Sequence, residues 1–156
     1  APFTGFGAFG RGRSGWVRPP NWQGPSALRG NWVGQEGNSL FRLNDATADA
    51  FGVARGTEVR FVEGTPDYAL FAQPTPAGTA GVFEVPGLTG FHDLDQPLIR
   101  RYLANEAGIS QAAVTRYLRA NDLRMHHFRG STVQLPPNNI HQLHHTGSAS
   151  ALRGAD

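Results

Sequence analysis

The chain of 156 residues contains no cysteine and no lysine, and it has no long apolar run. The absence of cysteine excludes disulfides, thiolate-bound metals and a cysteine nucleophile. Any bound metal must therefore be held by His, Asp, Glu or Asn side chains. No stretch approaches the roughly 18 apolar residues of a transmembrane helix, so we expect no membrane span. Because every basic residue is arginine, the positive charge is carried by planar guanidinium groups, which suit bidentate binding of phosphate.

The chain is rich in glycine and proline, with 20 and 11 residues, which indicates many loops and turns. Its length suits one domain with an accessory layer. Residues 1–34 are rich in Gly, Pro, Arg and Trp without periodicity, and we interpret them as an arm or linker. Its tryptophans are expected to pack on the body of this domain or on a larger parent protein. Residues 35–95 are expected to form a small mixed α/β layer. Residues 96–156 are expected to hold a helical hairpin and then the candidate site, and the predicted fold class is α+β.

The middle of the chain predicts several short elements. A helix is expected between a cap at Asn44 or Asp45 and its end at Gly52. Residues 57–64 alternate between apolar and polar and predict a strand, while "DYALFAQ" (67–73) and "GVFEVPG" (81–87) are further strand candidates. Nothing in this region has a catalytic pattern, so we look for the site further along the chain.

Residues 96–123 predict two helices, because apolar residues recur at helical spacing on both sides of Gly108 and Ser110 is a natural N-cap. Ala104, Gly108 and Val114 have the separations found in a helix-turn-helix. In that motif the residues near a major groove would be Gln111, Thr115 and Arg119. The alternative is a plain helical hairpin that packs on the core.

Positive charge is concentrated in the same region. Between Gln96 and Gly130 the sequence has six arginines against Glu106 and Asp122, a local net charge of +4. The net charge of the whole chain is only +2, which by itself does not argue for nucleic acid. The local excess indicates a surface that favours an anionic partner.

Five of the six histidines lie between Arg124 and Gly147. This segment predicts a strand, a glycine turn, a second strand and a helix that begins near Pro137, with Asn138 or Asn139 as its N-cap. The helix is expected to stop at Thr146 and Gly147. Strand, turn, strand and helix thus follow one another within one short stretch.

The spacing of these histidines indicates a metal site. His141 and His145 are four residues apart and would share one helix face, where both can bind a single cation. His126 and His127 are adjacent on a strand and would point to opposite faces. We expect one of this pair to bind the metal beside His141 and His145, and the other to face the substrate as a base. Three imidazoles leave coordination positions open for water or phosphate, which is typical of a catalytic site.

Six segments occur in an order that is informative: "GNSLF", "VRFVEGTPDYALFA", "VPGLTG", "MHHF", "TVQLPPNNIH" and "HHTGSASALRG". Together they resemble the HNH/endonuclease VII superfamily, whose fold is the ββα-metal finger. More narrowly, the sequence is similar to the nuclease domains at the C-termini of bacterial polymorphic toxins, which include Rhs-type and secretion-system effectors. The resemblance extends from Trp32 to Gly154.

The resemblance implies a role for each histidine. His126 would bind the metal together with His141 and His145, and His127 would be the general base that activates water. The fold it implies is a ββα-metal finger preceded by the helical hairpin and the mixed layer. Two positions depart from the family pattern. Met125 stands where toxin relatives often have Trp, and the middle Asn of the family has its nearest equivalents, Asn138 or Asn139, unusually close to the helix.

These observations predict a metal-dependent endonuclease toxin that hydrolyses DNA phosphodiester bonds with weak sequence preference. The metal is a divalent ion: imidazoles favour zinc or nickel, whereas magnesium or manganese would serve turnover. Phosphate contacts are expected from arginines that lie near the histidines or on the second hairpin helix, namely Arg119, Arg124, Arg129 and Arg153.

The resemblance also implies a secreted effector that acts in the cytoplasm of a target cell, and a cognate immunity protein as partner. The sequence gives no indication of oligomeric state. Two alternatives stay open. One is a non-catalytic helix-turn-helix module that binds DNA and holds a structural metal, and the other is the same nuclease acting on RNA.

Overall fold

The computed structural model describes residues 15–143. They form two compact units, one that ends at Asp67 and one that runs from Tyr68 to Leu143. Both units contain helices and antiparallel sheet, so the predicted α+β class is confirmed. His145, Arg153 and the predicted end of the last helix lie outside the described residues.

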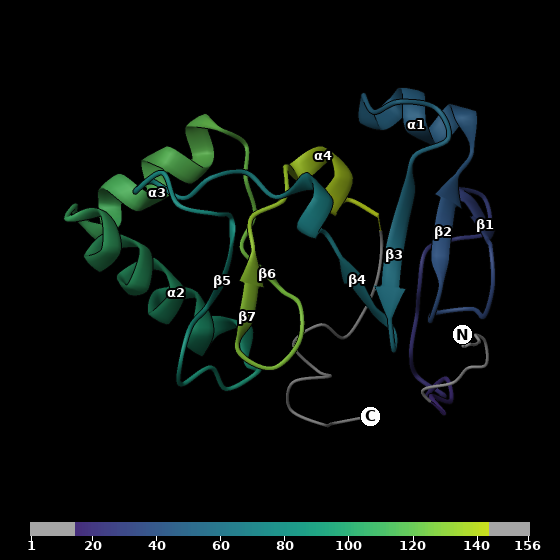
Figure 1. Cartoon of the computed structure of the whole chain (residues 1–156), viewed down its shortest axis with the longest axis horizontal. Coiled ribbons are helices and arrows are strands. Elements are labelled where there is room, and N and C mark those ends of the chain that lie inside the picture. The colour runs from purple at the N-terminus through teal and green to yellow at the C-terminus, as the bar shows by residue number, and fades with distance from the viewer. Residues whose placement is uncertain (1–14, 144–156) are drawn as a thin grey trace. The chain divides into compact units, whose positions relative to one another are not determined.

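The first unit is built on a four-stranded antiparallel sheet in the order β1 (Gly30–Trp32), β2 (Leu40–Leu43), β3 (Glu58–Val62) and β4 (Thr65–Asp67). Helix α1 (Asp45–Phe51) connects β2 to β3 (Figure 1). The predicted caps of this helix are confirmed. The Asn44 side chain accepts a hydrogen bond from the Thr47 backbone N–H at 2.9 Å, and Gly52 ends the helix with a φ of 72°.

The tryptophans of the predicted arm pack on this sheet. Trp22 is buried, and its Nε1–H donates to the Gly64 carbonyl at 2.8 Å. The Trp32 ring lies 5.0 Å from Phe41 and 4.9 Å from Phe61 between centroids. Trp32 is the last residue of β1, so the end of the predicted arm forms a strand of the sheet. Packing of the Trp32 ring against Phe41 and Phe61 stabilises the pairing of this strand.

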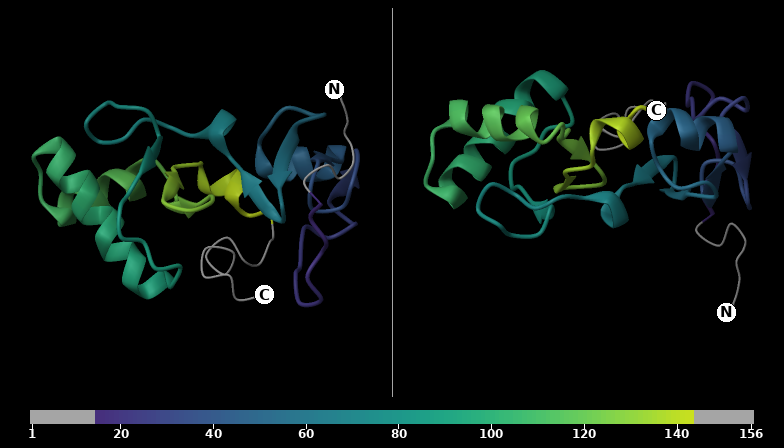
Figure 2. Two further views of the ribbon diagram at one scale, coloured as in Figure 1. Left: turned by 60° about the horizontal axis from the view of Figure 1, so that its bottom comes forward. Right: turned by 90° about the horizontal axis from the view of Figure 1, so that it is seen from above.

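The second unit contains a three-stranded antiparallel sheet in the order β5 (Val82–Glu84), β7 (Thr132–Gln134) and β6 (His126–His127). Two longer helices, α2 (His92–Ala107) and α3 (Gln111–Ala120), are joined by a short turn, contact each other and lie beside this sheet (Figure 2). A short helix, α4 (Asn138–His141), follows β7. After β5, this unit therefore continues as helical hairpin, strand, strand and short helix.

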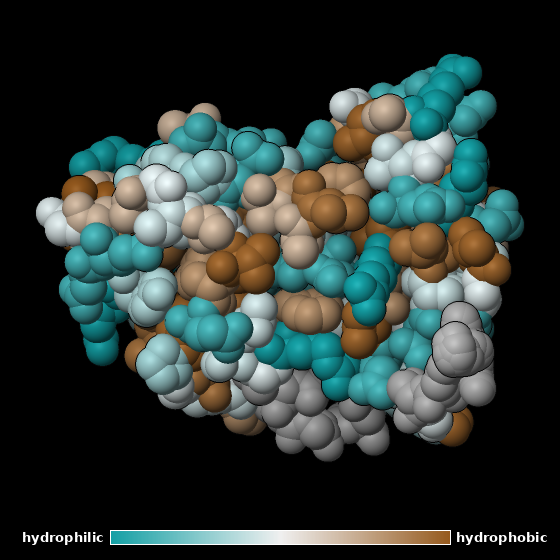
Figure 3. Space-filling model, in the orientation of Figure 1, coloured by the Kyte–Doolittle hydropathy of each residue, from teal (hydrophilic) through white to brown (hydrophobic). Residues whose placement is uncertain are grey.

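The helical hairpin and the sheet share one hydrophobic core. Gly108 ends α2 with a φ of 67°, which a side chain would strain, and the Ser110 side chain caps α3 by accepting from the Ala113 N–H. Both predicted features are confirmed. Large buried side chains of this core come from the two helices and from the sheet: Ile99, Leu103, Val114, Leu118, Val133 and Leu135. On the face shown in Figure 3, the surface over α2 and α3 mixes polar and apolar residues, with polar residues predominating.

Three elements differ from the sequence prediction. The "DYALFAQ" segment forms a short 3-10 helix, η2 (Ala69–Phe71), and not a strand. Helix α2 begins at His92 and not near Gln96, because two aspartates in its first turn favour the helix dipole and Asp95 binds the loop before it. Helix α4 has Pro137 as N-cap without a side-chain cap, so the predicted Asn cap is wrong. The Asn138 side chain instead accepts from Arg124.

No helix between residues 15 and 143 is long and apolar enough to cross a membrane.

Candidate functional site

The adjacent histidines on β6 project to opposite sides of the small sheet. His126 stands opposite Gln134 and His127 opposite Val133 on β7. Both imidazoles are buried, with 2% and 5% of their residue surface exposed. Because neighbouring residues of a strand alternate in direction, the two rings have separate environments. Each environment is made by residues of the second unit.

On one side, His126 meets His141 of α4. Their ring centroids are 5.3 Å apart with the ring planes at 72°. His141 is half-buried, and its backbone N–H donates to the Pro137 carbonyl, so the first turn of α4 fixes where this residue emerges. A histidine of the first hairpin strand and a histidine of the helix after the hairpin are thereby brought together.

Tyr68 completes this side of the site. Its ring lies 4.7 Å from the His126 ring and 5.6 Å from the His141 ring between centroids. Tyr68 is fully buried, and its backbone N–H donates to the Gln134 side chain at 2.8 Å. Burial raises the pKa of the Tyr68 phenol, which keeps the hydroxyl protonated. This hydroxyl has no hydrogen-bond partner within the described part of the chain, which is costly for a buried polar group.

On the other side, His127 meets Asp95 of α2. Its Nε2 lies 3.1 Å from Asp95 Oδ2, close enough for an ion pair but without the alignment of a good hydrogen bond. Asp95 is fully buried and is held by three donors at 2.8 Å each: the backbone N–H and the hydroxyl of Thr89, and the backbone N–H of Gly90. The carboxylate is therefore fixed in place by the loop before α2.

These surroundings determine the charge of both groups. Burial acts to raise the pKa of Asp95, but the hydrogen bonds from Thr89 and Gly90 and the nearby His127 outweigh it, so this pKa is lowered. Burial is also the largest influence on His127 and lowers its pKa, although Asp95 opposes the effect. At neutral pH the pair consequently consists of a carboxylate and a neutral imidazole. A neutral imidazole beside a fixed carboxylate can accept a proton and be stabilised once charged.

The predicted supporting and phosphate-binding residues lie at different places. Asn138 Oδ1 accepts from Arg124 Nε at 2.7 Å, which ties this arginine to α4. Asn139 Oδ1 accepts from the Ile140 backbone N–H next to it, so its oxygen is used within α4. Arg129 lies in the turn between β6 and β7. Arg153 lies outside the described residues.

A cavity of about 300 Å³ opens next to His141. It is lined by His141, Asn138 and Gln142 at one end and by His92, Gln96, Arg124 and Met125 at the other. Arg119 lines an adjoining cavity that shares Gln96, Arg124 and Met125 with the first. Arg129 lines neither of these two cavities. Of the two candidate metal ligands, His141 therefore lines a cavity that is also lined by the Arg124 guanidinium group.

The spacing of the His126 and His141 rings is compatible with one shared metal ion. Two imidazoles bound to one zinc ion at about 2.0–2.1 Å in a tetrahedral arrangement have ring centres about 5 Å apart, close to the separation of His126 and His141. The Tyr68 ring packs beside both imidazoles, and its buried, unpartnered hydroxyl is a further polar group that a bound ligand could satisfy. Within residues 15–143 no group of three His, Asp or Glu side chains is placed to hold a metal. The predicted third ligand, His145, lies outside the described residues.

Sequence reasoning missed two residues of this site. The sequence places Tyr68 in a predicted strand, "DYALFAQ", and nothing in the sequence around Asp95 marks it as a site residue. His92 lines the cavity with His141 and acts to lower the pKa of His127. No spacing rule links these positions to the histidine segment, because they reach it only through the packing of α2 and η2.

No family model, curated protein or solved structure matches this chain.

Proposed function

We propose that the chain is a metal-dependent endonuclease, and that His126 and His141 hold a divalent metal ion while His127 activates water. The observation that carries the proposal is the convergence of the His126 and His141 rings, with a third histidine of the same strand fixed on the opposite side by Asp95. The element order strand, strand, helix of β6, β7 and α4 supports the proposal of a ββα-metal finger, which the sequence resemblance implies. His145 is the proposed third ligand.

A bound divalent ion would neutralise charge on the phosphodiester and on its leaving oxygen. The chain's own residues supply the rest. His127 is the proposed base: its neutral ring would accept a proton from water, and Asp95, 3.1 Å from its Nε2, would stabilise the imidazolium that results. The ring lies on the side of β6 opposite His126, so this role requires water to reach the Asp95 side of the strand. Arg124, held by Asn138, positions a phosphate beside His141. The Tyr68 hydroxyl is a donor for an oxygen bound near His126 and His141.

The proposed substrate is DNA with weak sequence preference, because the charged groups near the site are guanidinium groups suited to phosphate contacts, which carry no sequence information. The sequence resemblance supports the further proposal that the domain is a secreted toxin that acts in the target-cell cytoplasm and is neutralised by a cognate immunity protein.

The test is incubation of the purified chain with supercoiled plasmid DNA and with total RNA, in magnesium, manganese, zinc or nickel. We expect nicking of the plasmid that EDTA abolishes, while circular dichroism shows the fold retained. Cleavage of RNA alone would replace the proposed substrate. Cleavage of neither nucleic acid in any metal, with unfolding on addition of EDTA, would instead indicate a DNA-binding module with a structural metal.

A further inference from the structure

We infer that the cavity between α2 and α3 is the channel in which the phosphate backbone of the nucleic acid strand lies before it reaches the metal site. This inference deepens the proposed function and rests on it for the direction of the strand. It adds Arg100 and Gln96 of α2 to the residues that the sequence predicts to contact phosphate. It also gives α3 a role other than reading base edges.

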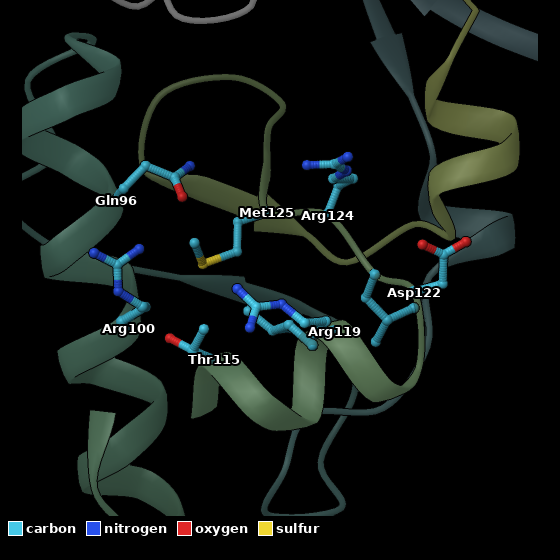
Figure 4. Close-up of a pocket in the computed structure, with 9 residues that line it drawn as sticks. Gln96, Arg100, Thr115, Arg119, Asp122, Arg124 and Met125 are labelled. Atoms are coloured by element: carbon cyan, nitrogen blue, oxygen red, sulfur yellow. The ribbon is translucent and has the colours of Figure 1, made fainter. Parts of the chain in front are cut away.

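The cavity has a volume of about 360 Å³ and is basic. Three arginines line it, one from each of its walls, against a single acidic residue, Asp122. Arg100 belongs to α2, Arg119 to α3, and Arg124 to the segment that leads into β6. Figure 4 shows Arg100 and Arg119 on opposite sides of Met125, with Thr115 below it in the view. Guanidinium groups that converge from separate elements can contact several phosphates of one strand.

The arginines of the two helices are uncommitted within the described chain. Among residues 15–143, neither Arg100 nor Arg119 makes an ion pair or a side-chain hydrogen bond, whereas Arg18, Arg42 and Arg55 each pair with a carboxylate. Charged groups that gather at a hollow without compensation raise the local potential and attract an anion. The lining also contains Leu118, Leu123 and Met125, which offer apolar contact to a sugar or base.

The cavity leads to the proposed catalytic metal. It shares Gln96, Arg124 and Met125 with the cavity that His141 lines. A nucleic-acid strand with its phosphates in the first cavity can thus continue past Arg124 to the histidines. A single phosphate ion cannot span both cavities. Because Thr115 and Arg119 line this hollow with α2, they are placed for backbone contacts, and the helix-turn-helix interpretation of major-groove reading is not needed.

The test compares two double variants of equal charge, both in the His127→Ala background that prevents cleavage. The first, Arg100→Gln/Arg119→Gln, removes two arginines that line the cavity and is called the groove variant. Arg101→Gln/Arg116→Gln removes an exposed arginine from each of the same helices, outside the cavity lining. Binding of fluorescein-labelled single-stranded and duplex DNA is measured by anisotropy between about 50 and 200 mM salt.

We expect the groove variant to bind about 10–100-fold more weakly, with the slope of log Kd against log salt reduced by about 2, one per lost contact. The control variant should bind like its parent, and circular dichroism should show both folded. Equal weakening by the two variants, or no weakening by the groove variant, would overturn the inference. So would displacement of the oligonucleotide by an equal concentration of inorganic phosphate, which would indicate a site for a single phosphate.

Binding and cleavage separate this inference from the proposed function. If the chain binds DNA through Arg100 and Arg119 but cleaves nothing, the channel stands and the nuclease proposal fails. With His127 present, the groove variant should raise KM and leave kcat nearly unchanged, since contacts remote from the reacting phosphate contribute uniform binding. A fall in kcat at unchanged KM would contradict a role in binding.

Discussion

The rings of His126 and His141 lie 5.3 Å apart between centroids, although one belongs to a strand and the other to the helix after the hairpin. Their neighbour His127 faces the other way, 3.1 Å from Asp95. The two halves of the proposed site, one for a metal and one for a base, can therefore be tested separately.

Replacing the proposed base should stop cleavage and spare metal binding. General base catalysis contributes about 10²–10⁴-fold, so His127→Ala should lower the rate of plasmid cleavage by at least about 10²-fold. Calorimetry should show metal affinity close to that of the unchanged chain, because the ring projects away from His126 and His141. Cleavage at the normal rate by a folded His127→Ala protein would refute the assignment of the base.

Replacing a proposed ligand should do the opposite and remove the metal. Loss of a group that only orients a ligand costs about 10–100-fold in metal affinity, so His126→Ala or His141→Ala should cost at least that much. The measurement is calorimetric titration with zinc, with His92→Ala as a histidine control at the rim of the same cavity. Equal losses in all three variants would show nonspecific binding by a histidine-rich surface.

Asp95 should act through His127. Asp95→Asn keeps the size of the side chain but removes the charge that stabilises the imidazolium, so the rate of plasmid cleavage should fall. The loss of rate should be no larger than the loss in His127→Ala. The double variant Asp95→Asn/His127→Ala should cleave no more slowly than His127→Ala alone, because residues that act as a unit are not additive. Additive losses would mean that Asp95 only maintains the loop at Thr89 and Gly90.

The Tyr68 hydroxyl should matter only to the bound state. Because it is buried without a partner in the described chain, Tyr68→Phe should leave the free energy of unfolding of the metal-free protein unchanged or raise it by about 1 kcal/mol. If the hydroxyl serves an oxygen bound beside the two histidines, the same variant should lower metal affinity or cleavage. Urea unfolding and calorimetry measure the two effects. Destabilisation of the metal-free protein would instead reveal a structural partner for the hydroxyl.

Glu84 should make the second unit sensitive to acid. Its carboxylate accepts from the hydroxyls of Ser131 and Thr132 at 2.6 Å each, and these bonds lower its pKa from the ordinary 4.5. The stabilisation is therefore present above pH 4.5 and is lost as pH falls through the lowered pKa of the folded state. Since the group is exposed, the effect should stay below about 1 kcal/mol. In urea unfolding, Glu84→Gln should be less stable than the parent at pH 7, and the difference should vanish as the pH falls below the lowered pKa of Glu84. A pH-independent difference would contradict this.

Local chemistry explains which parts of the fold were predictable. Asn44 and Ser110 cap helices, and Gly52 and Gly108 end them, because caps and left-handed glycines depend on a few neighbouring residues. The short 3-10 helix at Ala69–Phe71 was missed because Tyr68 and its neighbours have strand-like composition, and tertiary packing decides their conformation.

The sequence by itself determined that no thiolate takes part, that five histidines are confined to one hairpin and the segment after it, and that His126 and His127 must face apart. These follow from composition and from the alternation of side chains along a strand. Only the tertiary structure decided that Asp95 meets His127, that Tyr68 joins His126 and His141, and that arginines of both hairpin helices line one cavity. The physical reason is that such contacts arise when separate elements bury a common core, and spacing along the chain does not record them.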